Sequence, residues 1–321
     1  MGTDAPAPRH AAVAVRLPDA TTGAAIIVAV CAVSSSAPIV AFAAAPALAI
    51  GFWRTALAAG ALSPYALLRR RGELRALVLG PARREGLFCV LAGVALAAHF
   101  GAWLPAAKLT TAAAATALGA TQPVWQGLIA RAQGRRLSAV TWCGIALAVL
   151  GAIVATGADF EVSLRAVAGD LLAVAGGAGA AAYTAFGERA RATTSTTSYT
   201  SICYAVCALL LGGVCLAAGV PLVGFTVTAW LAILGLTVGA QLLGHSMFMY
   251  ALRRVPATTV SILVLLEVPG ATLIAYLWLG QTARPAALGG LALLLVGVAV
   301  VVLGAARGTG RTTTASDASL G

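Results

Sequence analysis

Charged residues are scarce in this chain: Asp, Glu, Lys and Arg make up 10% of its 321 residues, while hydrophobic residues make up 60%. Soluble globular domains carry about 25% charged residues. Composition therefore excludes a soluble domain, and the chain is predicted to be an all-α polytopic membrane protein.

The sequence also lacks the residue patterns of metal sites and of common active sites. Its six cysteines all lie within apolar stretches, without CxxC or Cys/His spacing, so neither a metal site nor a disulfide is predicted. HExxH, paired Asp-rich, Ser/His/Asp and phosphate-binding glycine motifs are absent as well. We therefore expect a protein that is not an enzyme and needs no cofactor.

No apolar core of a cleavable signal peptide is present in residues 1–22, which are polar and contain proline. This segment is predicted to be an N-terminal tail. Beyond it the chain has ten apolar stretches, each close to the ~20 residues with which a helix crosses the hydrocarbon. They cover residues 23–43, 48–68, 86–105, 111–130, 138–156, 168–187, 198–218, 228–250, 258–279 and 286–306. Ten transmembrane helices are predicted.

Basic residues are unevenly distributed between the two sides of these predicted spans. All but four of the 21 Lys and Arg residues lie in the tails or in every second connection; the exceptions are Arg54, Lys108, Arg165 and Arg284. Positive residues mark the cytoplasmic side. We predict a multi-pass protein of the cell inner (plasma) membrane with both termini cytoplasmic. The formal charge of +11 then reflects topology, and no nucleic-acid partner is expected.

The two halves of the chain match at special residues when one is shifted by 146 positions. The matched pairs are His99 with His245, Pro123 with Pro269, Gly134 with Gly280, Gly144 with Gly290, and Gly151 with Gly297. Five spans per half is an odd number, so the second half would enter the membrane upside down, as in many secondary transporters. We predict two inverted five-helix repeats at 23–156 and 168–306, an extracytoplasmic linker at 157–167 and a cytoplasmic tail at 307–321. A duplicated bundle without transport activity is the alternative.

Glycines recur every seven residues in the fifth and tenth spans, at positions 144, 151, 290, 297 and 304. Such stripes let helices approach closely in lipid. Inside a ten-helix protein they more often pack the monomer than a dimer, and a homodimer stays open.

Several stretches resemble the EamA family of the drug/metabolite transporter superfamily. "PALAIGFWRTALAAGAL" is similar to that family's second span, and "LAAHFGAWLPAAKLTTAAAATALGATQPVWQGLIA" to its third and fourth. "LLGHSMFMYALRRVPATTVSILVLLEVPGATLIAYLWLG" is similar to its eighth and ninth. The resemblance covers nearly all of residues 23–306. It implies an export-type carrier of a small metabolite or xenobiotic that works by alternating access.

Glu267 is the single acidic residue deep within a predicted span. An intramembrane charge is costly and is a functional candidate by default. Glu267 is interpreted either as a proton or cation site or as a structural carboxyl, neutral or paired with Arg54 or a histidine. Arg54 itself has three interpretations: a partner of Glu267, a ligand of a substrate carboxylate, or a side chain that reaches towards the membrane surface.

Other polar and aromatic residues are predicted around the same midplane. His99 and His245 are either proton relays beside Glu267 or histidines bonded to backbone carbonyls. Gln122 and Gln126 share a helical face and bind substrate or a neighbouring helix. Two aromatic residues, Trp103 and Tyr183, line the cavity or belong to interfacial belts. Two prolines, Pro123 and Pro269, are predicted to kink the fourth and ninth spans.

The sequence therefore predicts a secondary transporter, an exporter of a small metabolite or drug-like compound, with coupling to protons through Glu267. An uncoupled facilitative uptake carrier and a non-transporting scaffold or scramblase are the alternatives. The predicted partners are a small-molecule substrate, the lipid bilayer and protons.

Overall fold

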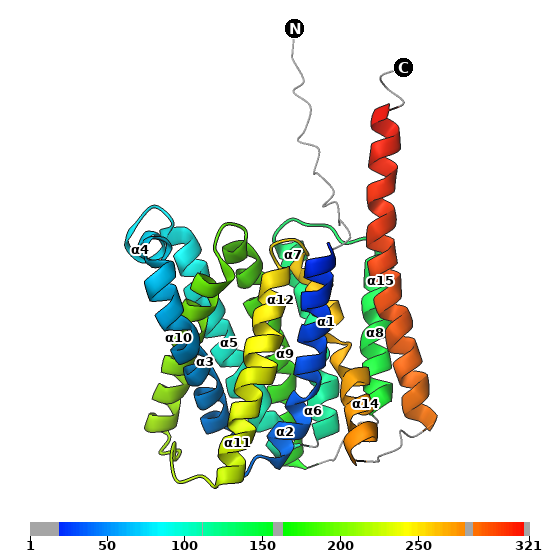
Figure 1. Ribbon diagram of the computed structural model, residues 1–321. Helices are drawn as coiled ribbons and strands as arrows, with labels where there is room; N and C mark the ends of the chain where they lie inside the picture. Colours follow the sequence, from blue (N-terminus) through cyan, green and yellow to red (C-terminus); the bar gives the residue numbers. More distant parts are fainter. Residues whose placement is uncertain (1–18, 111, 157–162, 280–284, 318–321) are drawn as a thin grey trace.

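The computed structural model describes residues 19–110, 112–156, 163–279 and 285–317. Within these ranges the chain is helical throughout, without strands (Figure 1). The elements are α1 (Ala20–Ser34), α2 (Ser36–Phe42), α3 (Ala47–Arg69), α4 (Arg71–Leu79), α5 (Arg83–Leu109), α6 (Ala112–Gly119), α7 (Gln122–Ala132), α8 (Ala139–Thr156), α9 (Leu164–Arg191), α10 (Thr196–Ala217), α11 (Val227–Leu236), the π-helix η1 (Thr237–His245), α12 (Ser246–Ala251), α13 (Ala257–Val264), α14 (Glu267–Leu279) and α15 (Pro285–Asp317).

Seven helical segments in the described part are long and apolar enough to cross a membrane by length and composition. They are 20–40, 83–109, 139–156, 164–191, 196–217, 227–251 and 257–274. A shorter apolar segment covers 287–303. The fold class predicted from sequence, an all-α multi-pass membrane protein, is therefore confirmed.

The shift of 146 residues also aligns the helices. It places α3 on α10, α5 on α11 to α12, α6 and α7 on α13 and α14, and α8 on α15. Matched segments run in opposite directions. In Figure 1, α6 and α7 lead from the lower to the upper end of the bundle, whereas α13 and α14 lead from the upper end to the lower.

Both predicted proline kinks are interruptions of a helix. The fourth predicted span divides into α6 and α7 at Ala120 and Thr121, directly before Pro123. The ninth divides into α13 and α14 at Leu265 and Leu266, before Pro269. Proline lacks an N–H and disfavours helical geometry in the residue before it, so a new helix begins where proline stands in the first turn.

The glycine stripe packs α8 directly against α15. A Cβ added at Gly151 would overlap the backbone nitrogen of Leu294, and one at Gly297 would overlap that of Ala148. The stripe therefore brings together equivalent helices of the two halves of one chain. This agrees with the interpretation that the glycines pack helices within a monomer. Beyond Gly297, α15 continues to Asp317, so the helix extends past residue 306, where the sequence predicts a tail.

Two other predicted segments lie largely outside the described residues. These are the N-terminal tail, of which residues 1–18 are not described, and the linker, of which 157–162 are not described. The described part of the linker, residues 163–167, begins with Ser163, whose side chain accepts a hydrogen bond from the backbone N–H of Ala166 and caps α9.

Candidate substrate cavity

A cavity of about 130 Å³ lies inside the bundle, between elements of both halves. Its walls come from α1, α2, α3, α5, α6, α7, α9, η1, α12, α13 and α14. Seven of the eight binding or coupling residues predicted from sequence line it: Arg54, His99, Trp103, Gln122, Tyr183, His245 and Glu267. The remaining wall residues are mainly apolar, and Phe100, Phe248 and Val264 are among them.

Arg54 lies in the interior, not at the membrane surface. Its side chain is 1% exposed, and its guanidinium carbon stands 4.4 Å from the centre of the Phe100 ring. Its Nε donates to Oε1 of Gln241 at 3.0 Å. One terminal nitrogen has no hydrogen-bond partner within the described residues. The interpretation in which Arg54 reaches the surface is therefore wrong, and two fixed contacts hold its free edge at the cavity.

A π-helical turn supplies the partner of Arg54. Within η1 the carbonyl of Gln241 accepts from the Ser246 N–H, five residues on, and from the hydroxyls of Tyr204 and Ser246, both at 3.3 Å. The Tyr204 and Ser246 hydroxyls are 2.9 Å apart. Such turns are rare in proteins as a whole, but where they occur they often lie at functional sites. Here the turn carries Gln241 to Arg54 and His245 to the cavity.

Gln241, Tyr204 and Ser246 were not predicted from the sequence. No residue pattern predicts a π-turn at this place. A polar amide within the eighth apolar stretch was the one available signal for Gln241.

The two equivalent histidines meet inside the cavity. Their ring centres are 6.4 Å apart, although 146 positions separate them in the chain. His99 Nδ1 lies 2.8 Å from the carbonyl oxygen of Gly176, and since a carbonyl only accepts, Nδ1 is the donor. This is the carbonyl-bonded state, one of the two roles that the sequence left open for His99. His245 packs its ring between Phe100 and Tyr183.

Glu267 is the first residue of α14, at the interruption of the ninth span. It is half-buried and lines the cavity. No hydrogen bond or ion pair reaches its carboxylate from the described residues, so the pair with Arg54 is not formed in this state. The N-terminal end of a helix favours a negative charge. The interruption therefore gives this carboxyl group both a cavity and a favourable helix end.

The two glutamines differ in position. Gln122 lines the cavity and its Nε2 donates to the Thr184 hydroxyl at 3.2 Å. Gln126 is fully buried but is not part of the cavity wall. Neither polar atom of the Gln126 amide has a partner within the described residues.

Polar contacts between the halves close the arginine-rich end of the bundle, the upper end in Figure 1 where α4 lies. Glu188 of α9 accepts from Arg135 at 2.9 and 3.2 Å and from the backbone N–H of Ala257 at 3.0 Å. We call these three residues the Glu188 junction. It links the end of α7 to α9 and to the start of α13.

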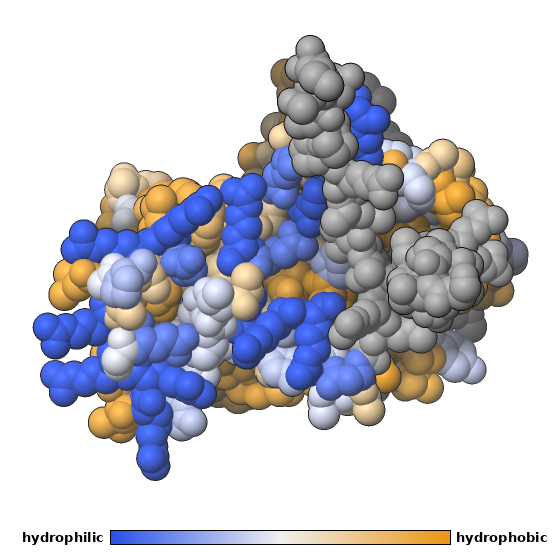
Figure 2. All heavy atoms as spheres, turned by 90° about the horizontal axis from the view of Figure 1, so that it is seen from above, coloured by the Kyte–Doolittle hydropathy of each residue, from blue (hydrophilic) through white to orange (hydrophobic). Residues whose placement is uncertain are grey.

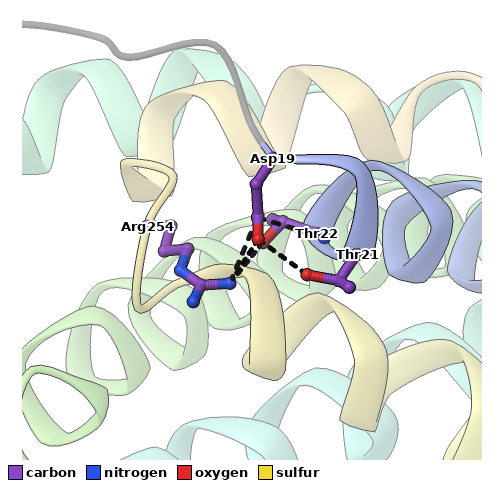
Figure 3. A network of polar contacts seen from close by, with 4 residues as sticks. All are labelled: Asp19, Thr21, Thr22 and Arg254. Atoms are coloured by element: carbon purple, nitrogen blue, oxygen red, sulfur yellow. Dashed lines mark hydrogen bonds and ion pairs between the residues drawn. The ribbon is translucent and has the colours of Figure 1, made fainter.

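A second contact joins the start of α1 to the turn after α12 (Figure 3). Arg254 lies 3.0 Å from the carboxylate of Asp19, which also accepts from the Thr21 hydroxyl and the Thr22 N–H. These hydrogen bonds, with the nearby Arg254 charge, lower the pKa of Asp19 to about 2. Asp19 is therefore ionised across the physiological range.

Comparison with known proteins assigns the family. A sequence model described as "EamA-like transporter family" matches residues 21–157 and again 167–303. The chain belongs to the EamA-like transporter family. The two matches confirm the sequence resemblance and the internal repeat. Among solved structures, one described only as "Crystal structure of protein" shares 21% identity with this EamA-like chain and has a TM-score of 0.72. The match covers 90% of this chain and 99% of the other, which shows the fold alone. No curated protein matches.

Proposed function

We propose that this EamA-like protein is a secondary transporter that exports a small amphipathic metabolite or drug-like compound across the inner membrane by alternating access. The proposal takes ten crossings: α4 is left outside the membrane, and α1 with α2, α6 with α7, α11 with η1 and α12, and α13 with α14 each count as one. The arginine-rich end faces the cytoplasm, in accordance with the positive-inside rule.

One observation carries the proposal: a cavity between the two halves is lined by a carboxylate that has no partner in the described part of the chain, a buried arginine and two histidines. Intramembrane charges usually face substrate or ion pathways. Membrane transporters with inverted repeats place substrate between the repeats, at interrupted helices. Glu267 is both an acidic residue within a predicted membrane span and the first residue after a helix interruption.

The cavity walls indicate which substrates fit. Phe100, Trp103 and Phe248 offer apolar and aromatic surface to the body of a molecule. The free edge of Arg54 offers hydrogen-bond donors to an accepting group, in line with the substrate-binding interpretation of the sequence. A molecule with an apolar body and a single polar group suits such a site better than a highly charged one.

Glu267 is the proposed coupling residue. Protonation removes its charge before the helix interruption moves through the apolar interior, and release of the proton restores it on the other side. Without this step a fixed charge would oppose the movement, because an ionised carboxylate in hydrocarbon is expensive.

Counterflow in proteoliposomes tests whether the protein transports at all. Vesicles preloaded with amino acids, nucleosides or cationic dyes are diluted into labelled compound of the same kind. Saturable accumulation of one compound class supports a carrier. Lipid flux without accumulation of any solute would identify a scramblase, and neither activity would identify a scaffold.

A further inference from the structure

Six arginines cluster at one corner of the bundle, in the turn from α3 through α4 to the start of α5. α4 follows directly on α3 and precedes α5, and Figure 1 shows it at the upper end of the bundle. Figure 2, viewed onto that end, shows long hydrophilic side chains gathered at the left, over this corner. The residues are Arg69, Arg70, Arg71, Arg75, Arg83 and Arg84, and we call them the α4 arginines.

The α4 arginines are exposed and unneutralised. Within the described residues, ion pairs occur at Arg135 and Arg254 but at none of these six. Two carboxylates belong to the same segment, Glu73 and Glu85, and Glu73 accepts from the N–H and hydroxyl of Ser195 and from the hydroxyl of Ser198. Six arginines against two glutamates leave this corner with an excess of positive charge.

Apolar side chains are exposed beside these charges. Leu68 is 82% exposed, and Leu67, Val78, Leu79 and Leu87 are each more than half exposed. Exposed leucines next to arginines are typical of a helix that lies in the membrane interface, with apolar side chains in the acyl region and basic groups at headgroup level. α4 follows directly on α3, whose apolar residues pack in the core of the bundle, and we therefore place α4 at the membrane interface.

We propose that the α4 arginines form a binding site for the headgroup phosphates of anionic phospholipids. Guanidinium groups bind phosphate through two parallel hydrogen bonds, which an ammonium group cannot match. The interleaved leucines favour a lipid over a soluble phosphate or a nucleic acid, because only a lipid brings acyl chains for them to contact. This site is separate from the cavity and does not depend on the proposed transport function.

Native mass spectrometry of protein released from vesicles with equal phosphatidylglycerol and phosphatidylcholine tests the site. The wild type is expected to retain phosphatidylglycerol preferentially. In the variant Arg69→Gln, Arg71→Gln, Arg75→Gln the ratio of the two bound lipids should fall about fivefold or more, the factor for one surface arginine. Arg131→Gln, Arg136→Gln, Arg253→Gln removes the same charge elsewhere at that end and should leave the ratio unchanged.

Two further arms keep the test decisive if the first variant fails to fold. Lysine at the same three positions should keep part of the preference and exceed the glutamine variant, because the charge remains while the paired hydrogen bonds to phosphate are lost. Wild-type protein released at high salt should lose it, because salt screens exposed charges. An unchanged ratio in the glutamine variant, an equal fall in the control variant, or a salt-independent ratio would each overturn the proposal.

Discussion

At the scale of single residues, Glu267 is tolerated in the membrane interior because the chain is interrupted beside it. A continuous helix would surround its carboxyl with packed apolar side chains. The break at Leu265 and Leu266 places it at the start of α14 and against the cavity. Gly270 of α14 packs closely on Ser34 of α1, where a Cβ would overlap the Ser34 side chain.

Arg54 allows a test that separates function from structure. Replacing it by an apolar side chain relieves a buried charge that has no opposite charge among the described residues, but leaves the buried Oε1 of Gln241 without its donor. We expect Arg54→Met to abolish counterflow with little net change in stability, because these two effects oppose each other. Thermal unfolding and counterflow of the same preparation measure both effects.

The contrary result for Arg54 is equally clear. A less stable variant that keeps its transport rate would mean that Arg54 holds helices together and does not bind substrate. Gln126→Leu, which removes a buried amide that is not part of the cavity wall, is the matched control for the loss of a polar group.

Glu73 gives a prediction about pH. Burial opposes its ionisation, but hydrogen bonds from Ser195 and Ser198 prevail and lower its pKa below the ordinary 4.5. A carboxyl whose pKa is lower in the folded state contributes stability above its unfolded pKa and loses it as pH falls through the folded value. The contribution should therefore be complete at neutral pH and be lost progressively as pH falls from the ordinary value of 4.5 through the lower folded value.

The Glu73 prediction is measured by thermal unfolding of wild type and Glu73→Ala at several pH values. Loss of this cap on α10 should cost about 1 kcal/mol at pH 7, with the two proteins converging in acid. A difference that is constant with pH would contradict the role of the ionised carboxylate.

At the scale of helices, the glycine stripe between α8 and α15 provides neighbouring test positions. A Cβ at Gly290 would overlap the backbone nitrogen of Ala155, whereas a Cβ at Gly289 meets nothing within 4 Å. Gly290→Ala should therefore destabilise the protein by about 1–3 kcal/mol through overpacking.

Gly289→Ala is the control, because it changes helix propensity equally without a clash. It should be neutral or stabilising by up to about 1 kcal/mol. Equal stability of the two variants would mean that α8 and α15 are not in close contact.

At the scale of helices, the sequence alone was enough to predict the membrane class and the internal repeat. Long apolar runs and matched histidines, prolines and glycines predicted the membrane class and the repeat, because hydrophobic periodicity and special backbone residues are local signals. Seven of eight expected site residues line one cavity, since polar groups in apolar helices turn inward. Gln126 does not line the cavity, although it shares a helical face with Gln122. Gln122 is the one residue of α7 in the cavity wall.

What the sequence did not reveal depends on tertiary contacts. In the π-turn of η1 the carbonyl of Gln241 accepts from the hydroxyls of Tyr204 and Ser246, and Tyr204 comes from another helix. Likewise the Glu188 junction pairs Arg135 with a residue 53 positions away. Neither partner can be chosen from local sequence alone.

At the scale of the whole molecule, both ion pairs among the described residues join the two halves at the arginine-rich end, while hydrogen bonds between the halves occur elsewhere too, as from Trp53 Nε1 to the Leu222 carbonyl. The Glu188 junction and the Asp19–Arg254 pair both join residues on either side of the repeat boundary. Movement of one half against the other must break them. They are therefore expected to stabilise the state in which this end is closed.

Glu188→Gln should weaken that closed state, because it removes the charge that holds Arg135 and the start of α13. Hydrogen–deuterium exchange should become faster in residues 132–136 and 252–258, while the opposite end of the bundle is unchanged. Asp170→Asn, which removes a carboxylate of α9 outside the junction, is the control. Identical exchange in wild type and Glu188→Gln would show that the junction does not hold the closed state.

The central claim is that Glu267 couples transport to protons in the cavity between the repeats. The most direct measurement is uptake of the substrate found by counterflow into proteoliposomes with an imposed pH gradient, for wild type, Glu267→Gln and the control Glu85→Gln. We predict that gradient-driven accumulation is lost in Glu267→Gln and kept in Glu85→Gln, while exchange without a gradient survives in all three. Equal gradient-driven accumulation in wild type and Glu267→Gln would contradict the account and leave Glu267 as a structural carboxyl.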